Sequence, residues 1–103
     1  MIVASGYNVS GPEVEQTLIA HPDVKEVAVV GKRDPERETN IVKAFVVLVD
    51  GCTDSDEKAD ELRDFCKREI ASFKAPREIE FVRELPRTQT GKLQRYKLRE
   101  LSS

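Results

Sequence analysis

The residues best suited to chemistry lie near the C-terminal end, in the run Thr88-Gln89-Thr90-Gly91-Lys92. Two hydroxyl side chains, a glycine and a lysine in one loop supply side-chain donors, backbone N–H groups and a mobile point charge. These groups favour the binding of an anion such as a phosphate. The run is not a P-loop, because that motif needs a glycine at the position of Pro86 and a hydroxyl residue at the position of Leu93.

The chain around this run is locally basic. Between residues 83 and 99 the single acidic residue Glu84 stands against six cations, which are Arg83, Arg87, Lys92, Arg95, Lys97 and Arg99. Composition alone leaves two interpretations open, a solvated helix face or a contact to phosphate or nucleic acid. The whole chain carries a net charge of −2, so an anion contact would depend on this local patch and not on bulk charge.

Metal chemistry has little support in the sequence. The chain has two cysteines, Cys52 and Cys66, outside any CxxC pair, and a single histidine, His21. These residues cannot form a four-ligand zinc site from Cys and His within one chain, and no metal site is predicted. Two cysteines are also too few for a disulfide scaffold, so we predict that both are reduced thiols.

The length of 103 residues corresponds to one domain and argues against a two-domain enzyme with an enclosed cleft. Hydrophobic residues make up 39% and charged residues 35%, a mixture typical of a globular domain and not of a disordered chain. No apolar run approaches the roughly 20 residues of a membrane span, and the N-terminus lacks the pattern of a signal peptide. We therefore expect a soluble cytoplasmic protein.

Extended and helical patterns alternate along the chain, which predicts a mixed α/β (α+β) fold. Residues 2–9 are β-prone but interrupted at Ser5-Gly6, which favours a short hairpin or a bent strand. Residues 24–31, 41–49 and 78–82 are expected to be strands, and the apolar stretch at 27–30 is typical of a central strand covered on both faces. We expect a small two-layer sandwich, in which a sheet of about three strands and the N-terminal hairpin pack with helices.

Two longer helices are expected on this sheet. The first begins near Pro12 and ends before His21-Pro22, because a residue that precedes proline is disfavoured in a helix. The second spans about residues 55–72, where Asp54 and Glu57 resemble a capping box. Its apolar positions recur every three or four residues and are Leu62, Phe65, Cys66, Ile70 and Phe73.

A short helix is expected at the C-terminal end, after the polar loop that carries Lys92. Its inward-facing residues are predicted to be Leu93, Tyr96 and Leu101.

Three stretches resemble segments of the acyl-CoA synthetases and related adenylate-forming enzymes. Residues 86–92, Pro-Arg-Thr-Gln-Thr-Gly-Lys, with Arg95 and Leu98-Arg99 beyond them, resemble the C-terminal lysine motif of that family. Residues 5–9 with 12–15 resemble the segment after the family's interdomain hinge, and residues 73–76 with 79–82 resemble the strand region between the two. The three stretches occur in the family's order and spacing, and the resemblance extends over essentially the whole chain.

The resemblance implies that residues 1–103 form a mobile C-terminal lid on a larger N-terminal domain. In the family, one lid orientation brings the motif lysine to the carboxylate and the α-phosphate for adenylation, and the other brings a glycine segment to the thiol of CoA. Carried over to this sequence, Lys92 is the adenylation lysine, and the thioester-stage loop consists of Ser5, Gly6 and Tyr7. The loop that contacts the nucleotide phosphates consists of Arg87, Thr88, Thr90 and Gly91.

The resemblance also implies partners and substrates. These are the N-terminal domain of the same enzyme, a carboxylic acid, ATP and CoA, with Mg²⁺ bound mainly outside this domain and no nucleic acid. The isolated chain is expected to be inactive, because catalysis needs reactants held by groups that it lacks. Residues 6–15 look more like the aromatic-acid and medium-chain ligases than the long-chain ones, and the hinge is expected just before Met1.

Two other functions are compatible with the residues. One is the corresponding domain of a peptide synthetase or a luciferase-like enzyme, and a peptide synthetase would require a carrier domain downstream of Ser103. The other is a free-standing module whose basic loop binds a phosphorylated partner or nucleic acid. The aromatic fraction of 6% and the absence of tryptophan argue mildly against base stacking.

Overall fold

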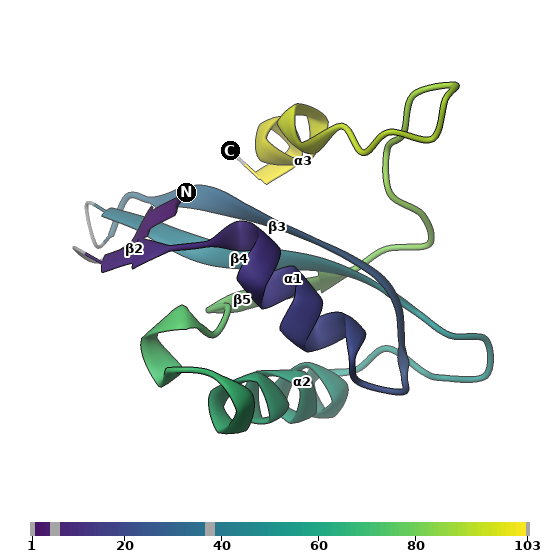
Figure 1. The fold of residues 1–103 in the computed structure, drawn as a ribbon, viewed down its shortest axis with the longest axis horizontal. Coiled ribbons are helices and arrows are strands. Elements are labelled where there is room, and N and C mark those ends of the chain that lie inside the picture. The colour runs from purple at the N-terminus through teal and green to yellow at the C-terminus, as the bar shows by residue number, and fades with distance from the viewer. Residues whose placement is uncertain (1, 5–6, 37–38, 103) are drawn as a thin grey trace.

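The computed structural model describes residues 2–4, 7–36 and 39–102 as one open sheet packed with three helices (Figure 1). Along the chain the elements are β1 (Ile2–Ala4), β2 (Tyr7–Val9), α1 (Gly11–Ile19), β3 (Val24–Asp34), β4 (Thr39–Leu48), α2 (Asp56–Glu69), the 3₁₀ turn η1 (Ser72–Lys74), β5 (Glu78–Phe81) and α3 (Arg95–Ser102). The predicted mixed α/β class is confirmed. No helix of the described part of the chain is long and apolar enough to cross a bilayer.

The centre of the sheet is β4. The sheet has five strands in the order β2-β1-β4-β3, and β5 also pairs with β4. The pairing of β4 is antiparallel with β3 and parallel with β1 and β5. The predicted N-terminal hairpin is confirmed as the antiparallel pair β1 and β2, and it joins the main sheet through the pairing of Ala4 with Asn40.

The prediction that residues 27–30 belong to a central strand is wrong, because β3 lies at the edge of the sheet. Its apolar stretch has another cause. Val29 packs in the core on the face of α1 and α2, whereas Ala28 and Val30 pack in the core on the face of α3. An apolar run therefore indicates that both faces of a strand are covered, but it does not indicate how many strands pair with it.

Two clusters of buried side chains hold the helices to the sheet. On one face, Leu18 of α1 and Leu62 of α2 pack against Ala44 and Val46 of β4. On the other face, Phe45 and Val47 of β4 pack with Leu85 and Leu98. The expected α/β sandwich is thus confirmed, but it has more than the two expected layers, because α3 covers the second face of the sheet (Figure 1).

The ends of the helices follow local capping chemistry. The first helix begins and ends where the sequence predicts, with the Ser10 hydroxyl accepting from the backbone N–H of Glu13 at 3.3 Å. The predicted Asp54 and Glu57 capping box is wrong by one residue, because Ser55 is the N-cap of α2 and its hydroxyl accepts from the Lys58 N–H at 3.0 Å. The helix ends at Glu69, before the expected residue 72.

Two aromatic residues that were expected to face inward are exposed. Phe73 falls in the 3₁₀ turn beyond α2 and is 46% exposed. Tyr96 is 53% exposed, because α3 starts at Arg95 and turns Leu98 towards the sheet instead. Leu93 precedes the helix and packs half-buried against the core, and the side chain of Leu101 lies outside the described part.

Candidate functional site

Residues 87–93 form a tight hairpin, which we call the lysine loop. Arg87 and Leu93 form a β-bridge, and the backbone N–H of Thr88 donates to the Lys92 carbonyl at 2.9 Å. The Lys92 N–H donates to the Thr88 hydroxyl oxygen at 3.0 Å. Gly91 has a φ of +85°, in the left-handed region that favours glycine. The loop therefore holds a defined backbone shape around its lysine.

The lysine loop stands on a buried base. Leu85 on one side and Leu98 on the other are 5% and 2% exposed and belong to the core cluster on the α3 face. The backbone N–H of Gln94 closes the base by donating to the Pro86 carbonyl at 2.9 Å. The loop thus projects from its buried base next to α3, on the opposite side of the sheet from α2 (Figure 1).

Lys92 differs from the arginines around it in its electrostatic surroundings. Arg87 pairs with Glu26 of β3 at 2.6 Å, and Arg95 pairs with Glu15 of α1 at 2.5 Å. The side chain of Lys92 is exposed, and no acidic group among the described residues pairs with it. Lys92 is therefore the cation of this loop that is open to an outside anion.

The second predicted site segment lies far from the lysine loop. Ser5 and Gly6 fall outside the described residues, and Tyr7 begins β2, where it pairs with Ala4 of β1. In Figure 1, β1 and β2 lie at one end of the sheet and the loop before α3 lies at the other. The structure therefore does not bring the two predicted segments together within this chain.

A basic hollow that was not predicted from the sequence adjoins the N-terminal hairpin of β1 and β2. It encloses about 460 Å³ and is lined by Ala4, by the cations Arg63, Lys67 and Arg77, and by Phe73. Arg63 and Lys67 are four residues apart in α2, and this spacing places them on one helix face. That spacing was the available signal, but the position of Arg77 beside them depends on the fold.

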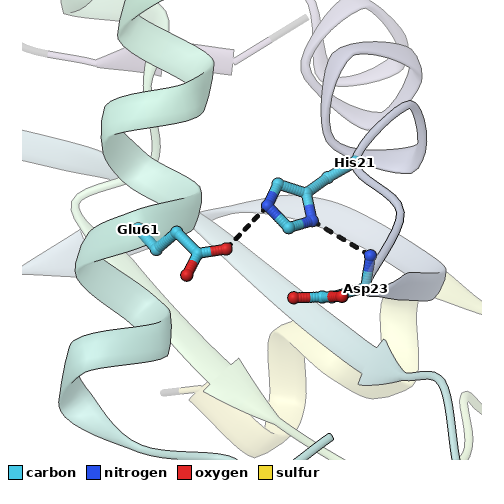
Figure 2. A group of neighbouring side chains, drawn as sticks. All are labelled: His21, Asp23 and Glu61. Carbon is cyan, nitrogen blue, oxygen red and sulfur yellow. Dashed lines mark hydrogen bonds and ion pairs between the residues drawn. The ribbon is translucent and has the colours of Figure 1, made fainter.

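His21, Asp23 and Glu61 form the one group of possible metal ligands found among the described residues, with ligand atoms within 4.8 Å of one another (Figure 2). Nε2 of His21 is 2.8 Å from the Glu61 carboxylate, and Nδ1 accepts from the Asp23 N–H at 3.0 Å. The Lys58 ammonium already pairs with Asp23 at 2.5 Å and with Glu61 at 3.3 Å. We interpret the group as an ionic network that joins the α1–β3 turn to α2.

Ionisation in and near this network follows from its pairing. The hydrogen bond from Lys58 lowers the pKa of Asp23, and the same contact raises the pKa of Lys58.

Burial raises the pKa of the Cys52 thiol and raises that of Cys66 to about 11. Both cysteines are free thiols, as predicted, and Cys66 is a buried, protonated core residue at neutral pH.

The model of the AMP-binding enzyme C-terminal domain family matches residues 13–92, which is more than half of the chain. The chain therefore belongs to this family, whose members are domains of adenylate-forming enzymes. Among relatives, the mitochondrial acyl-coenzyme A synthetase ACSM4 of Mus musculus is 46% identical over 102 residues, covering 97% of this chain and 17% of the relative. The acetyl-coenzyme A synthetase of Bacillus subtilis is 45% identical over 95 residues, covering 92% of this chain and 16% of the relative.

Solved structures agree with these relatives. The acyl-CoA synthetase of Brucella canis superposes with a TM-score of 0.93 at 46% identity, covering 98% of this chain and 18% of that one. The anthranilate CoA ligase AuaEII, solved with anthranoyl-AMP, gives 0.91 at 44% identity, covering 100% and 20%. The chain thus spans no more than a fifth of the length of the proteins named. Their names favour an acyl-CoA ligase domain over a peptide synthetase, a luciferase-like enzyme or a free-standing module.

Proposed function

We propose that residues 1–103 act as the mobile C-terminal lid of an ATP-dependent acid–CoA ligase and that Lys92 assists adenylation. In that step a carboxylate oxygen bonds to the α-phosphorus of ATP and the bond to pyrophosphate breaks. Negative charge shifts onto the leaving pyrophosphate, so a positioned ammonium stabilises the transition state. The observation that carries the proposal is the exposed Lys92, unpaired among the described residues, on a loop with a buried base.

The lysine loop supplies more than one group to this step. Thr88, Thr90 and Gly91 form the part of the loop that contacts the phosphates, and Arg87, which pairs with Glu26, stands at its base. The hydroxyls of Thr88 and Thr90 are hydrogen-bonded to each other at 3.0 Å, so one hydroxyl proton of the pair remains to be donated to an anion. ATP, the acid and Mg²⁺ are held mainly by the N-terminal domain of the same enzyme, which is the partner of this lid.

The second step uses the other end of the domain. Ser5, Gly6 and Tyr7 form the loop that meets the thiol of CoA, where the absence of a side chain at Gly6 leaves room for the pantetheine chain. β2, which begins at Tyr7, and the lysine loop lie at opposite ends of the sheet (Figure 1). One rigid domain cannot present both ends to one reaction centre at once, and this supports a lid that adopts two orientations in turn.

The basic hollow is suited to the nucleotide end of CoA during that second step. It lies next to Ala4, the residue before Ser5, so a ligand there would extend towards the thioester-stage loop. Arg63, Lys67 and Arg77 match phosphate groups, and the exposed ring of Phe73 can stack on adenine. The Lys67→Ala variant of the full enzyme should raise the KM for CoA several-fold, whereas Arg68→Ala beside it should not.

The acid is proposed to be aromatic or of medium chain length. The similarity to an anthranilate CoA ligase and to a benzoate CoA ligase, each at 44% identity, supports this class. The cytoplasmic location expected from the sequence stays a prediction, because the mouse relative is mitochondrial by name.

The deciding experiment measures both half-reactions in the full-length enzyme that contains this chain. Lys92→Ala should lower the rate of adenylation by about 100-fold to 1,000-fold, as for the loss of one preorganised donor. The same variant, supplied with ready-made acyl-adenylate, should form thioester at a near-normal rate, and Lys97→Ala serves as the control. Equal losses in both steps for Lys92→Ala would mean that the lysine is structural and would remove the proposal.

The thioester-stage loop is tested by the opposite pattern. Gly6→Leu should slow thioester formation and leave pyrophosphate release intact, because the added side chain obstructs the path of the thiol. The melting temperature of the variant is compared first, since a side chain at a glycine can also strain the backbone. Normal thioester formation in a folded Gly6→Leu enzyme would exclude the role of this loop.

A further inference from the structure

Two arginines flank Lys92, and each is tied to the body of the domain by a carboxylate. Arg87 lies before the lysine and pairs with Glu26 on β3. Arg95 lies after the lysine and pairs with Glu15 on α1. Both pairs join segments far apart in the sequence, by 61 and 80 residues. The lysine loop is therefore attached to the edge strand β3 at its start, and the first residue of α3, just after the loop, is attached to α1.

Arg87 links Glu26 to the backbone beside Lys92. Its Nη2 donates to the Glu26 carboxylate at 2.6 Å, and its Nη1 donates to the carbonyl of Gly91 at 3.0 Å. The guanidinium group is planar and rigid, so a carboxylate that fixes one of its nitrogens also orients the other. Gly91 immediately precedes Lys92, and thus the position of Glu26 is transmitted to the lysine through one side chain.

The attachment through Arg95 has a different character. The carboxylate of Glu15 accepts from Arg95 at 2.5 and 3.1 Å and also from the backbone N–H of Val29 at 2.8 Å. Its side chain is only 15% exposed. A change at Glu15 would disturb the sheet as well as the loop. Glu26, at 31% exposure and with Arg87 as its partner, allows the loop to be tested alone.

We propose that Glu26 is a positioning residue for Lys92, acting through Arg87 and the Gly91 carbonyl. This role rests on the proposed function of Lys92 in adenylation. It assigns the guanidinium of Arg87 to holding the loop in shape, with the phosphates left to Lys92 and the groups beside it. Neither Glu26 nor Arg87 needs to touch the reacting atoms for either one to set the rate.

The test is a double-mutant cycle in the full-length enzyme, with the rate of pyrophosphate release in a single turnover as the measurement. Glu26→Gln keeps the shape of the side chain and removes its charge, and it should lower this rate about fivefold by misplacing the lysine. In a Lys92→Ala background, the same change should have no further effect, because the group that Glu26 positions is gone. An equal loss in both backgrounds would overturn the proposal.

Hydrogen exchange of peptides that cover residues 87–93 gives a readout that does not depend on catalysis. The N–H groups of Gly91 and Lys92 are bonded within the loop to Thr88, so Glu26→Gln should speed their exchange several-fold. Unchanged exchange would exclude a positioning role even if Lys92 proves essential. Faster exchange combined with a harmless Lys92→Ala would instead refute the proposed function and leave the structural link standing.

The matched control is Glu61→Gln, which weakens an ion pair between α2 and the α1–β3 turn, on the other face of the sheet. It should change neither the adenylation rate nor the exchange of residues 87–93. The charge exchange Glu26→Arg with Arg87→Glu should not recover the lost rate, because a glutamate at position 87 cannot donate to the Gly91 carbonyl. If neither single variant of that pair slows adenylation, the pair has no positioning role.

Discussion

At the scale of single residues, the lysine loop depends on one backbone conformation. Gly91 has a φ of +85°, and Gly51, in the turn after β4, has a φ of +91°. A Cβ atom built on either glycine would meet nothing within 4 Å. An alanine at either position would therefore suffer backbone strain without a clash, which makes Gly51 a matched control for Gly91.

Gly91→Ala and Gly51→Ala should each lower the free energy of unfolding by about 1 kcal/mol, because both force an L-residue into the left-handed region. Only Gly91→Ala should also slow adenylation in the full-length enzyme, since only that strain displaces Lys92. Denaturant unfolding and pyrophosphate release measure the two effects. Comparable slowing by both variants would show that the loss follows stability and not the shape of the loop.

Cys66 gives the domain a defined sensitivity to alkaline pH. Burial raises the pKa of its thiol from the usual 9.0 to about 11, so the folded state favours the protonated form. The resulting stability is present below pH 9 and is lost as the pH rises from 9 to 11, by about 2 to 3 kcal/mol at most. Urea unfolding between pH 7 and pH 10 should show a smaller alkaline loss in Cys66→Ala. Identical pH profiles for the two proteins would contradict this cause.

Part of the candidate site could be predicted from the sequence, and the rest could not, because its residues come together only in the folded chain. Hydroxyls, a glycine and a lysine within five residues suffice to predict an anion loop at Thr88 to Lys92, because the relevant groups are local. Glu26 lies 61 residues from Arg87, and nothing in either segment indicates that they meet. The cations of the basic hollow likewise come from separate elements, so only the fold shows them together.

At the scale of elements, residue types predicted which segments are helices and strands better than where they begin or how they pair. The second helix was expected from its apolar spacing, but Asp54 and Ser55 are both favoured N-cap types and stand next to each other. The extended backbone of Ser55, with φ −163° and ψ 165°, selects it as the cap. The apolar run at residues 27–30 did not indicate that β3 pairs with β4 and with no other strand of the described sheet.

The N-cap of α2 can be tested by comparing the two neighbours. Ser55→Ala should lower the free energy of unfolding by about 1 kcal/mol, because the Lys58 N–H loses its acceptor. Asp54→Ala should change it by less than about 0.5 kcal/mol, as is usual for a surface position. Thermal unfolding of both variants measures the difference. A larger loss for Asp54→Ala would restore the cap that the sequence suggested.

At the scale of the whole molecule, charge is divided between the two faces of the sheet. Residues 50–64, which comprise the turn before α2 and most of that helix, contain seven acidic and two basic residues, whereas residues 83–99 contain six basic and one acidic residue. α2 and α3 lie on opposite faces (Figure 1). This arrangement gives the lysine loop a positive potential that suits anions, whereas on the other face the cations that line the basic hollow, Arg63 and Lys67 of α2, stand within a largely acidic segment.

The 103-residue chain should fold by itself and lack ligase activity. Each face of the sheet has its own buried cluster, so a cooperative thermal transition is expected without the N-terminal domain. Pyrophosphate exchange with ATP and a panel of carboxylic acids should give no turnover, because the reactants are not held. Poor amide dispersion in the NMR spectrum would contradict the first expectation, and turnover by rigorously purified chain would contradict the second.

The contact between Glu15 and the edge strand also bears on self-association. A strand at the edge of a sheet offers unpaired N–H and C=O groups, which can template the addition of a strand from another copy. Here the carboxylate of Glu15 accepts the Val29 N–H, and a Cβ atom at Gly11 in α1 would lie 3.4 Å from the Val29 carbonyl oxygen. A helix and a carboxylate thus stand where an incoming strand would bind. These groups disfavour the addition of a strand from another copy at this part of the edge.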